Sequence, residues 1–116
     1  ELRSKPLIFI ATGSGISPYH SFIQSYPALE YRLIHGTSQL EEAYESEAYG
    51  SSYFHCVSRE DGGDFKGRVT EYLSALDPDR NAHAFLCGNC DMIYEVFDLL
   101  QEKGVPTAQI HTEVYF

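Results

Sequence analysis

The segment Leu7-Ile8-Phe9-Ile10-Ala11-Thr12-Gly13-Ser14-Gly15-Ile16-Ser17-Pro18 begins with an uninterrupted apolar run and ends in a turn that contains two glycines. Such a run is typical of a strand buried on both faces of a parallel sheet. The glycines allow the backbone to turn tightly, and Ser17 with Pro18 suit the start of a helix. Backbone N–H groups at such a helix start attract a pyrophosphate. A plain glycine turn is the alternative, because the third glycine of the usual dinucleotide fingerprint is missing.

Composition limits the class of protein. The chain has 116 residues, a formal net charge of −9 and 43% hydrophobic residues, which suits one domain with a buried core. The negative charge disfavours nucleic acid and anionic membranes as partners. No run approaches the ~18 apolar residues of a membrane span and no leader is recognisable, so we expect a cytoplasmic location. Three cysteines argue against a disulfide framework, and the five histidines lack metal-ligand spacing, so we expect no metal.

Strand and helix patterns alternate along the chain. The predicted strands are residues 7–11, 31–34, 53–58, 82–87 and 109–116, and the predicted helices are residues 19–26, 39–49, 69–76 and 91–103. Connections of this length force parallel pairing with right-handed crossovers. The sequence therefore predicts an α/β fold over residues 7–116, namely a Rossmann-like, open, doubly wound five-stranded parallel sheet with helices on both faces. Residues 1–6 are predicted to be a linker.

Ligands of such sheets bind at the carboxyl ends of the strands, near the point where the strand order reverses. The five predicted strand ends carry polar or glycine-rich segments: the glycine turn, residues 35–38, residues 58–59, residues 87–90 and residues 113–116. We expect the ligand site to be built from these segments.

Taken in order, these segments resemble the nicotinamide-nucleotide domain of the ferredoxin–NADP(+) reductase family. The matching pieces are ATGSGISP at 11–18, HG at 35–36, VSRE at 57–60, GRV at 67–69, LCGN at 86–89 with MI at 92–93, and IHTEVYF at 110–116. The resemblance covers nearly the whole chain. It implies that a flavin-binding domain precedes this one in the same polypeptide, that FAD is bound mainly there, and that this chain is a piece of a longer reductase.

The resemblance also implies a cofactor site. The glycine turn would line the pyrophosphate and the nicotinamide end of NADP(H). The residues that the resemblance assigns to cofactor binding are Thr12, Gly13, Gly15, Ile16, His35, Gly36, Ser58, Arg59, Arg68, Gly88, Asn89 and Met92. The family often carries an arginine just after the His-Gly pair, whereas this chain has Thr37 and Ser38, whose hydroxyls bind phosphate more weakly than a charged group.

The choice between NAD and NADP depends on the second and third strand ends. A sheet that holds NAD usually offers an acid at the end of its second strand, and the segment from 35 to 38 has none. Ser58, Arg59, Lys66 and Arg68 instead offer hydroxyl and cationic donors, which suit a 2′-phosphate. The resemblance assigns Ser58, Arg59 and Arg68 to that group, so NADP is predicted. The alternative is a solvated loop, because nearby acidic residues offset the positive charge.

Four residues are predicted to take part in the chemistry. The resemblance places Cys87 beside C4 of the nicotinamide, and Glu113 where it handles protons or the nicotinamide amide. It also implies that a terminal aromatic ring, that of Tyr115 or Phe116, covers the flavin and yields to the nicotinamide; an ordinary edge strand is the alternative. Cys87 and Cys90 form a Cys-x-x-Cys pair, which leaves a dithiol role as a further alternative.

The predicted function is that of the NADP(H)-binding domain of a ferredoxin- or flavodoxin–NADP(+) reductase. Hydride would pass from NADPH to FAD on the missing domain, and single electrons would leave to ferredoxin or flavodoxin, so the fragment alone would be inactive. Three alternatives remain: an NADH-dependent reductase component of an oxygenase system, a thiol redox protein that uses the Cys-x-x-Cys pair, and a nucleotide-sensing module without turnover.

Overall fold

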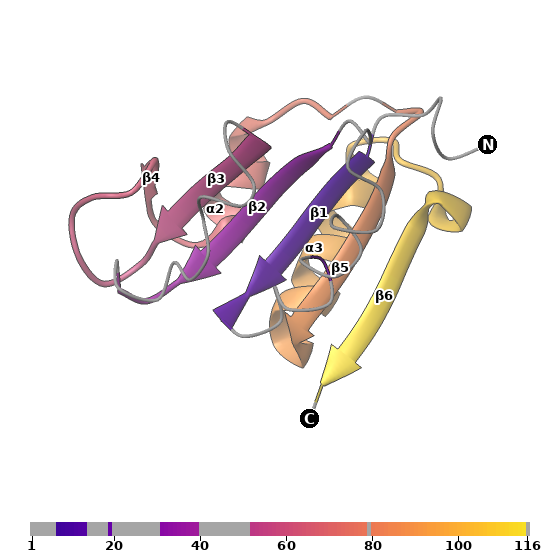
Figure 1. The fold of residues 1–116 in the computed structure, drawn as a ribbon. Helices are drawn as coiled ribbons and strands as arrows, with labels where there is room; N and C mark the ends of the chain where they lie inside the picture. The colour runs from indigo at the N-terminus through magenta and orange to yellow at the C-terminus, as the bar shows by residue number, and fades with distance from the viewer. Residues whose placement is uncertain (1–6, 14–18, 20–30, 40–51, 79, 116) are drawn as a thin grey trace.

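The computed structural model describes residues 7–13, 19, 31–39, 52–78 and 80–115, and for residues 113–115 it describes the backbone (Figure 1). These residues form the strands β1 (Leu7–Thr12), β2 (Arg32–Thr37), β3 (Tyr53–Val57), β4 (Phe65–Lys66), β5 (His83–Asn89) and β6 (Ile110–Tyr115). The helices are α2 (Val69–Ala75) and α3 (Cys90–Glu102), and a short 3₁₀ turn, η5 (Thr107–Gln109), precedes β6.

The strands form one sheet in the order β4-β3-β2-β1-β5-β6, and all neighbours pair in parallel. From β1 the chain moves outward through β2, β3 and β4, and it then returns to the other side of β1 for β5 and β6. The strand order therefore reverses between β1 and β5, which is the place where doubly wound sheets bind ligands. The predicted fold class, a Rossmann-like α/β parallel sheet, is confirmed.

The predicted number of strands is wrong, because the sheet has six strands rather than five. The additional strand is β4, whose two residues pair with Cys56 and Val57 of β3. A pair of residues carries no readable periodicity, so the sequence pattern showed only a polar loop there. Strands β2 and β5 also end later than predicted. β2 continues past residue 34 to Thr37 because these residues pair with β1 and β3, and β5 continues through Gly88 and Asn89 because both pair with β6.

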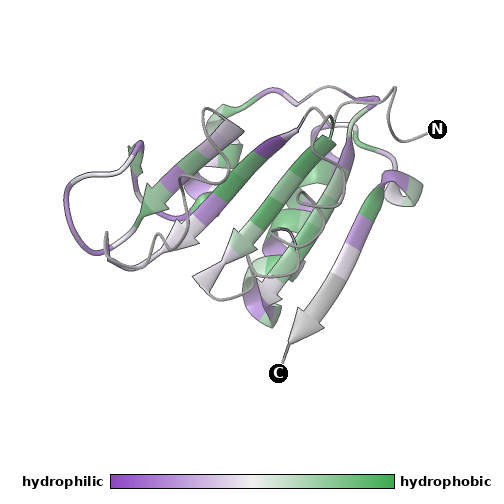
Figure 2. Cartoon of the chain, viewed as in Figure 1, coloured by the Kyte–Doolittle hydropathy of each residue, from purple (hydrophilic) through white to green (hydrophobic). Residues whose placement is uncertain are grey.

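The central strand β1 is apolar along most of its length (Figure 2), and its buried side chains alternate between the two faces of the sheet. On one face, Ile8 and Ile10 pack in a cluster with the apolar sides of α2 and α3. On the other face, Leu7, Phe9 and Ala11 cluster with Tyr19. The helices predicted at 19–26 and 39–49 lie outside the described residues apart from Tyr19 and Gln39, as does the predicted linker at 1–6.

Candidate functional site

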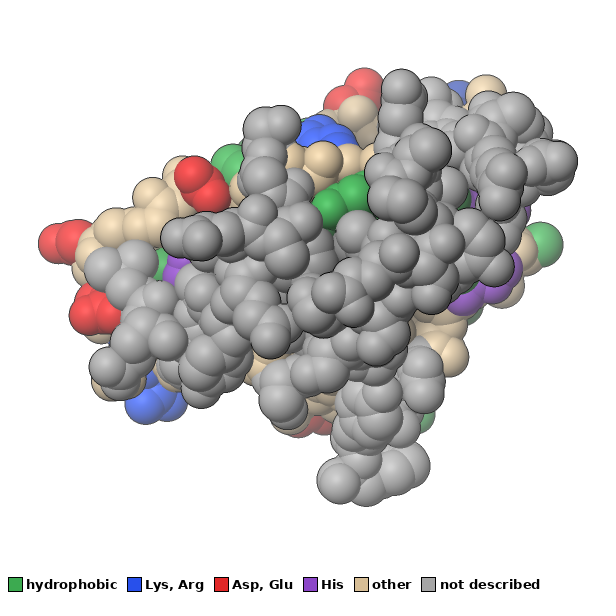
Figure 3. All heavy atoms as spheres, viewed as in Figure 1, with side chains coloured by type: hydrophobic (Ala, Val, Ile, Leu, Met, Phe, Trp, Pro, Cys, Tyr) green, Lys and Arg blue, Asp and Glu red, His purple; other side chains and the backbone are tan. Residues whose placement is uncertain are grey.

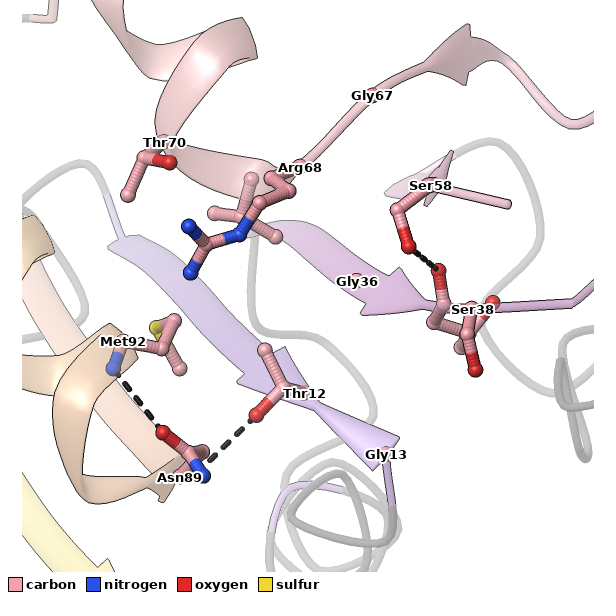
Figure 4. A pocket seen from close by; sticks show the side chains of 12 residues that line it. Thr12, Gly13, Gly36, Ser38, Ser58, Gly67, Arg68, Thr70, Asn89 and Met92 are labelled. Carbon is pink, nitrogen blue, oxygen red and sulfur yellow. Dashed lines mark hydrogen bonds between the residues drawn. The ribbon is translucent and has the colours of Figure 1, made fainter. Parts of the chain in front are cut away.

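A pocket of about 260 Å³ lies at the carboxyl ends of β1, β2, β3 and β5 and at the starts of α2 and α3 (Figure 4). Its position beside the reversal of strand order is the one expected for a ligand site. The residues that line it are Thr12, Gly13, Gly36, Thr37, Ser38, Ser58, Gly67, Arg68, Val69, Thr70, Asn89 and Met92.

One side of the pocket is the junction of β1 with the start of α3. Asn89 is the N-cap of α3, and its side-chain oxygen accepts hydrogen bonds from the backbone N–H groups of Asp91 and Met92. The backbone N–H of Asn89 donates to the hydroxyl of Thr12 at 3.2 Å. The Thr12 oxygen is an acceptor in this bond, so its own O–H remains able to donate to a ligand.

Glycine at position 88 allows this junction to close. Gly88 has a positive φ of 131°, and a Cβ atom at this position would lie 2.5 Å from the hydroxyl oxygen of Thr12. A side chain would therefore separate β5 from β1 at the floor of the pocket. The close approach explains why the chain carries glycine there.

The opposite side of the pocket is formed by the ends of β2 and β3. The backbone N–H of Ser58 donates to the Thr37 carbonyl at 3.0 Å, and that of Arg59 donates to the Ser38 carbonyl at 3.0 Å. The Ser58 hydroxyl donates to the Thr37 carbonyl over a longer distance of 3.4 Å. These bonds hold Ser38 and Ser58 beside one another at the rim of the pocket (Figure 4).

Arg68 supplies a positive charge to the pocket from the N-cap of α2. Its guanidinium points into the pocket on the side of Met92, whereas Ser38 and Ser58 lie on the other side (Figure 4). The Nη2 atom lies 3.4 Å from Oε2 of Glu95 on α3. Among the described residues that line the pocket, none carries a carboxylate, so the lining favours an anionic ligand.

Acidic and basic side chains are mixed on the outer surface at the β3–β4 end of the molecule (Figure 3). Lys66 lies in an exposed ion pair with Asp61, with the nitrogen 2.8 Å from the carboxylate oxygen. This pairing also holds the pKa of Asp61 below its usual value. Lys66 is thus engaged with the loop and does not line the pocket.

Two buried histidines lie behind the pocket on β2 and β3. The His35 ring bonds to the Gly13 carbonyl through Nε2 at 2.8 Å and to the Tyr53 hydroxyl through Nδ1 at 2.6 Å. The Nε2 of His55 lies 2.6 Å from the Thr37 hydroxyl, which itself donates to the Gln39 carbonyl. Each histidine therefore bonds to a residue that lines the pocket, and neither lines it.

The structure brings together much of the predicted cofactor site. The predicted cofactor-binding residues that line the pocket are Thr12, Gly13, Gly36, Ser58, Arg68, Asn89 and Met92. Gly88 and His35 lie behind the lining, and the exposed Arg59 adjoins Ser58 without lining the pocket. Gly15 and Ile16 lie outside the described residues.

The predicted catalytic residues lie along β5 and β6 or beyond the described part. Cys87 is buried, is not part of a disulfide and does not line the pocket, and it pairs in the sheet with Glu113. Tyr115 pairs with Asn89, which brings its backbone near the pocket. Phe116 lies outside the described residues. Cys90, the other half of the Cys-x-x-Cys pair, is also a free thiol.

Sequence reasoning did not assign four residues to the site. Gly67, Val69 and Thr70 line the pocket at the start of α2, and their place in or directly after the matched GRV segment could have indicated them. Glu95 contacts Arg68 from a different helix, and no local pattern could have predicted this contact.

Among the described residues, three or more His, Cys, Asp or Glu side chains nowhere come together as a metal site would require. The helices described here also include none that is long and apolar enough to cross a membrane.

Comparison with known proteins identifies the family. Residues 9–97 match the family described as the oxidoreductase NAD-binding domain, which is most of the chain. The chain belongs to this family, and the resemblance to the nucleotide domains of ferredoxin–NADP(+) reductase-type enzymes is confirmed.

The relatives carry this domain within longer polypeptides. A flavohemoprotein of Xylella fastidiosa is 24% identical, over 96% of this chain and 32% of the relative. The crystal structure of flavohemoglobin from Malassezia yamatoensis, with bound FAD and heme, is similar with a TM-score of 0.85 and 28% identity, over 97% of this chain and 32% of that one. Ferredoxin-NADP+ reductase from Plasmodium falciparum shares the fold, with a TM-score of 0.61 and 23% identity, over 96% of this chain and 52% of that one. The chain thus spans about a third to a half of these relatives.

Proposed function

We propose that the pocket binds NADPH and that the domain serves a cytoplasmic, flavin-dependent reductase. In this reductase NADPH supplies a hydride, which passes from C4 of the nicotinamide to N5 of FAD held mainly by another domain of the same polypeptide. The observation that carries the proposal is the lining of the pocket. It offers hydroxyls and one guanidinium beside the point where the strand order reverses, and the described lining residues include no carboxylate. The role of this domain is to bind and orient the nucleotide, since the cofactors supply the redox chemistry.

The nucleotide would lie across the strand ends. Thr12 and Gly13 would contact the pyrophosphate, with Gly15 and Ile16 following in the same turn. The adenosine end would lie toward Ser38 and Ser58. The nicotinamide end would lie toward β5 and β6, where Cys87, Glu113 and the aromatic residues Tyr115 and Phe116 are proposed to place it against the flavin.

The 2′-phosphate of NADPH would bind at the ends of β2 and β3. Ser58 lies at the rim there, and Arg59 is exposed next to it. The Arg68 guanidinium points to the Met92 side of the pocket and would turn toward Ser58 to reach the same phosphate. An NAD site would instead use an acid at the end of β2 to bind the ribose 2′-hydroxyl. Residues 35–38 at that end include no acid, which favours NADPH over NADH.

Titration calorimetry tests the cofactor preference. The 116-residue chain is titrated with 2′-phospho-AMP and with AMP, at low and at higher salt. We expect about tenfold tighter binding of 2′-phospho-AMP, which weakens with salt because the added phosphate is charged. Ser58→Ala and Arg68→Ala should reduce this preference. Arg80→Ala is the matched control. Arg80 precedes β5, so it lies near the amino ends of the strands, whereas the pocket lies at their carboxyl ends. Equal binding of the two ligands would overturn the NADPH proposal.

The electron acceptor has two candidates. Ferredoxin or flavodoxin follows from the reductase resemblance, and this acceptor would dock mainly on the flavin domain, because a chain with a net charge of −9 does not attract acidic partners. The flavohemoprotein and flavohemoglobin relatives favour a second candidate, a heme on a further domain of the same polypeptide. The full-length polypeptide decides between them, because NADPH would reduce either an added ferredoxin or a heme whose absorption spectrum changes.

A further inference from the structure

The His35 side chain is fully buried, and partners occupy both of its ring nitrogens. Nε2 lies 2.8 Å from the carbonyl oxygen of Gly13, and Nδ1 lies 2.6 Å from the hydroxyl oxygen of Tyr53. The sequence predicts that His35 contacts the cofactor, yet the ring lies behind the pocket lining. Its effect on a ligand must therefore pass through the residues that it holds.

The chemistry of the partners determines the direction of both hydrogen bonds. A carbonyl oxygen accepts and never donates, so Nε2 of His35 carries the proton that bonds to Gly13. In the neutral ring, Nδ1 then accepts the proton of the Tyr53 hydroxyl. The Gly13 carbonyl therefore fixes the tautomer of His35, and the Tyr53 hydroxyl supplies the donor that Nδ1 needs in this tautomer. The three residues form one directed chain of hydrogen bonds from β3 through β2 to the end of β1.

Gly13 is the first glycine of the turn that follows β1, and it lines the pocket. It adopts a φ of 53°, in the left-handed region that glycine occupies readily. Because its carbonyl oxygen bonds to a fully buried ring, that oxygen is turned toward the sheet and not toward a ligand. This matters for an anion, since a carbonyl oxygen facing a phosphate repels it, whereas N–H groups attract it.

We propose that His35 is a positioning residue for pyrophosphate binding: by donating from Nε2 to the Gly13 carbonyl, it keeps that oxygen out of the pocket. This inference rests on the proposed binding of a nicotinamide dinucleotide. It assigns Tyr53 a supporting role, because the Tyr53 hydroxyl bonds to Nδ1 and so holds the ring in place. The effect belongs to the pyrophosphate end of the ligand and not to the end that carries the 2′-phosphate.

Two ligands separate the two ends. NADP+ contains the pyrophosphate, whereas adenosine 2′-monophosphate carries no phosphate of that group and occupies only the adenosine side of the pocket. His35→Leu removes the donor at similar volume, and it should weaken NADP+ binding about tenfold while adenosine 2′-monophosphate binds as before. His35→Gln restores an N–H donor at a similar reach, and it should recover most of the lost affinity. Circular dichroism at the titration temperature checks that each variant is folded.

Tyr53→Phe tests the inference without removing the ring. Loss of the hydroxyl leaves Nδ1 without its partner and the ring less firmly held, so NADP+ should bind about threefold more weakly. Nitrogen-15 NMR of the His35 ring reports the tautomer directly, and it should show Nε2–H in both chains because the Gly13 carbonyl remains. Nδ1–H in the wild-type chain would overturn the proposal. The Tyr53→Phe variant and the NMR measurement keep the proposal testable if His35→Leu fails to fold.

Several outcomes would overturn the inference. His35→Leu could leave NADP+ binding unchanged, or weaken both ligands equally, and either result would make His35 a packing residue. Failure of His35→Gln to recover affinity would show that the ring shape matters and not the N–H. The proposed NADPH preference fails separately, if wild-type chain binds AMP as well as 2′-phospho-AMP. In that case NAD+ and adenosine form the ligand pair, and the same variants test His35.

Discussion

Arg68 and Glu95 form an ion pair between the start of α2 and the middle of α3, with 3.4 Å between Nη2 and Oε2. Both side chains are about half exposed, at 53% and 48%, and Arg68 also lines the pocket. The carboxylate therefore competes with an anionic ligand for the guanidinium. Because exposed pairs are worth about 0–1 kcal/mol, a ligand phosphate is able to displace Glu95.

Glu95→Gln should therefore increase the affinity for 2′-phospho-AMP by about threefold, since the arginine no longer has a competing charge. Calorimetry at low salt measures the change, which should shrink at high salt because screening weakens both interactions. Asp98→Asn is the matched control, because Asp98 is an exposed acid one turn further along α3. Weaker binding by Glu95→Gln would show that Glu95 instead holds Arg68 in its binding orientation.

Gly88→Ala should destabilise the fold by about 2–4 kcal/mol, because the new methyl group meets Thr12 and the φ of 131° is strained for alanine. Urea unfolding measures this loss. Gly13→Ala is the comparison, since Gly13 also has a positive φ, of 53°, but a Cβ there meets no atom of the described residues within 4 Å. Its cost should be about 1–2 kcal/mol, from the backbone alone. Equal losses would show that β5 moves away from β1 at little cost.

Asn89 combines a structural role with a place in the pocket, and two substitutions separate these. Asn89→Ala removes the N-cap of α3 and should cost about 1 kcal/mol of stability. Asn89→Asp keeps a capping oxygen and favours the helix dipole, so stability should be retained. The added negative charge in the pocket should nevertheless weaken NADP+ binding severalfold. Thermal unfolding measures the stability of the two variants, and calorimetry measures their affinity for NADP+. Unchanged NADP+ binding by Asn89→Asp would remove Asn89 from the proposed ligand site.

The sequence predicts best the elements with a long hydrophobic pattern. β1 has an unbroken apolar run and buries side chains on both faces of the sheet. α3 has an amphipathic pattern and buries its apolar side, so the place of both elements in the fold follows from the pattern. The two residues of β4 exist as a strand only because β3 lies beside them. The end of β5 depends in the same way on β6, since pairing carries the strand past Gly88.

In the candidate site, too, the sequence predicts local features but not contacts between distant segments. Strand ends and glycine positions are local properties of the sequence. They predict that Thr12, Ser58 and Arg68 lie at the carboxyl ends of the strands. Whether a residue faces the pocket or supports it from behind depends on the direction of its side chain. His35 and Gly36 are neighbours in sequence, yet only Gly36 lines the pocket. The contact of Arg68 with Glu95 depends on the packing of two helices.

The thiol of Cys56 should make stability fall at alkaline pH. Burial, with the Asp64 carboxylate as a smaller cause, raises the pKa of Cys56 from 9.0 to about 12. In the unfolded chain the thiol ionises near its ordinary pKa, so above about pH 9 the unfolded state loses a proton that the folded state retains. The stabilisation is thus complete below pH 9 and is lost as the pH rises toward 12.

Urea unfolding of wild-type chain and Cys56→Ala between pH 7 and pH 11 checks this prediction. Cys56→Ala loses packing at every pH, because position 56 is fully buried in the core, so the informative quantity is the slope of stability against pH. Subtracting the variant cancels the titration of the tyrosines and lysines that both chains share. We expect the wild-type advantage to narrow above pH 9 and stay constant below it, because only the wild-type chain exposes an ionisable thiol at position 56 on unfolding. Parallel curves throughout would mean that the folded protein accommodates the thiolate.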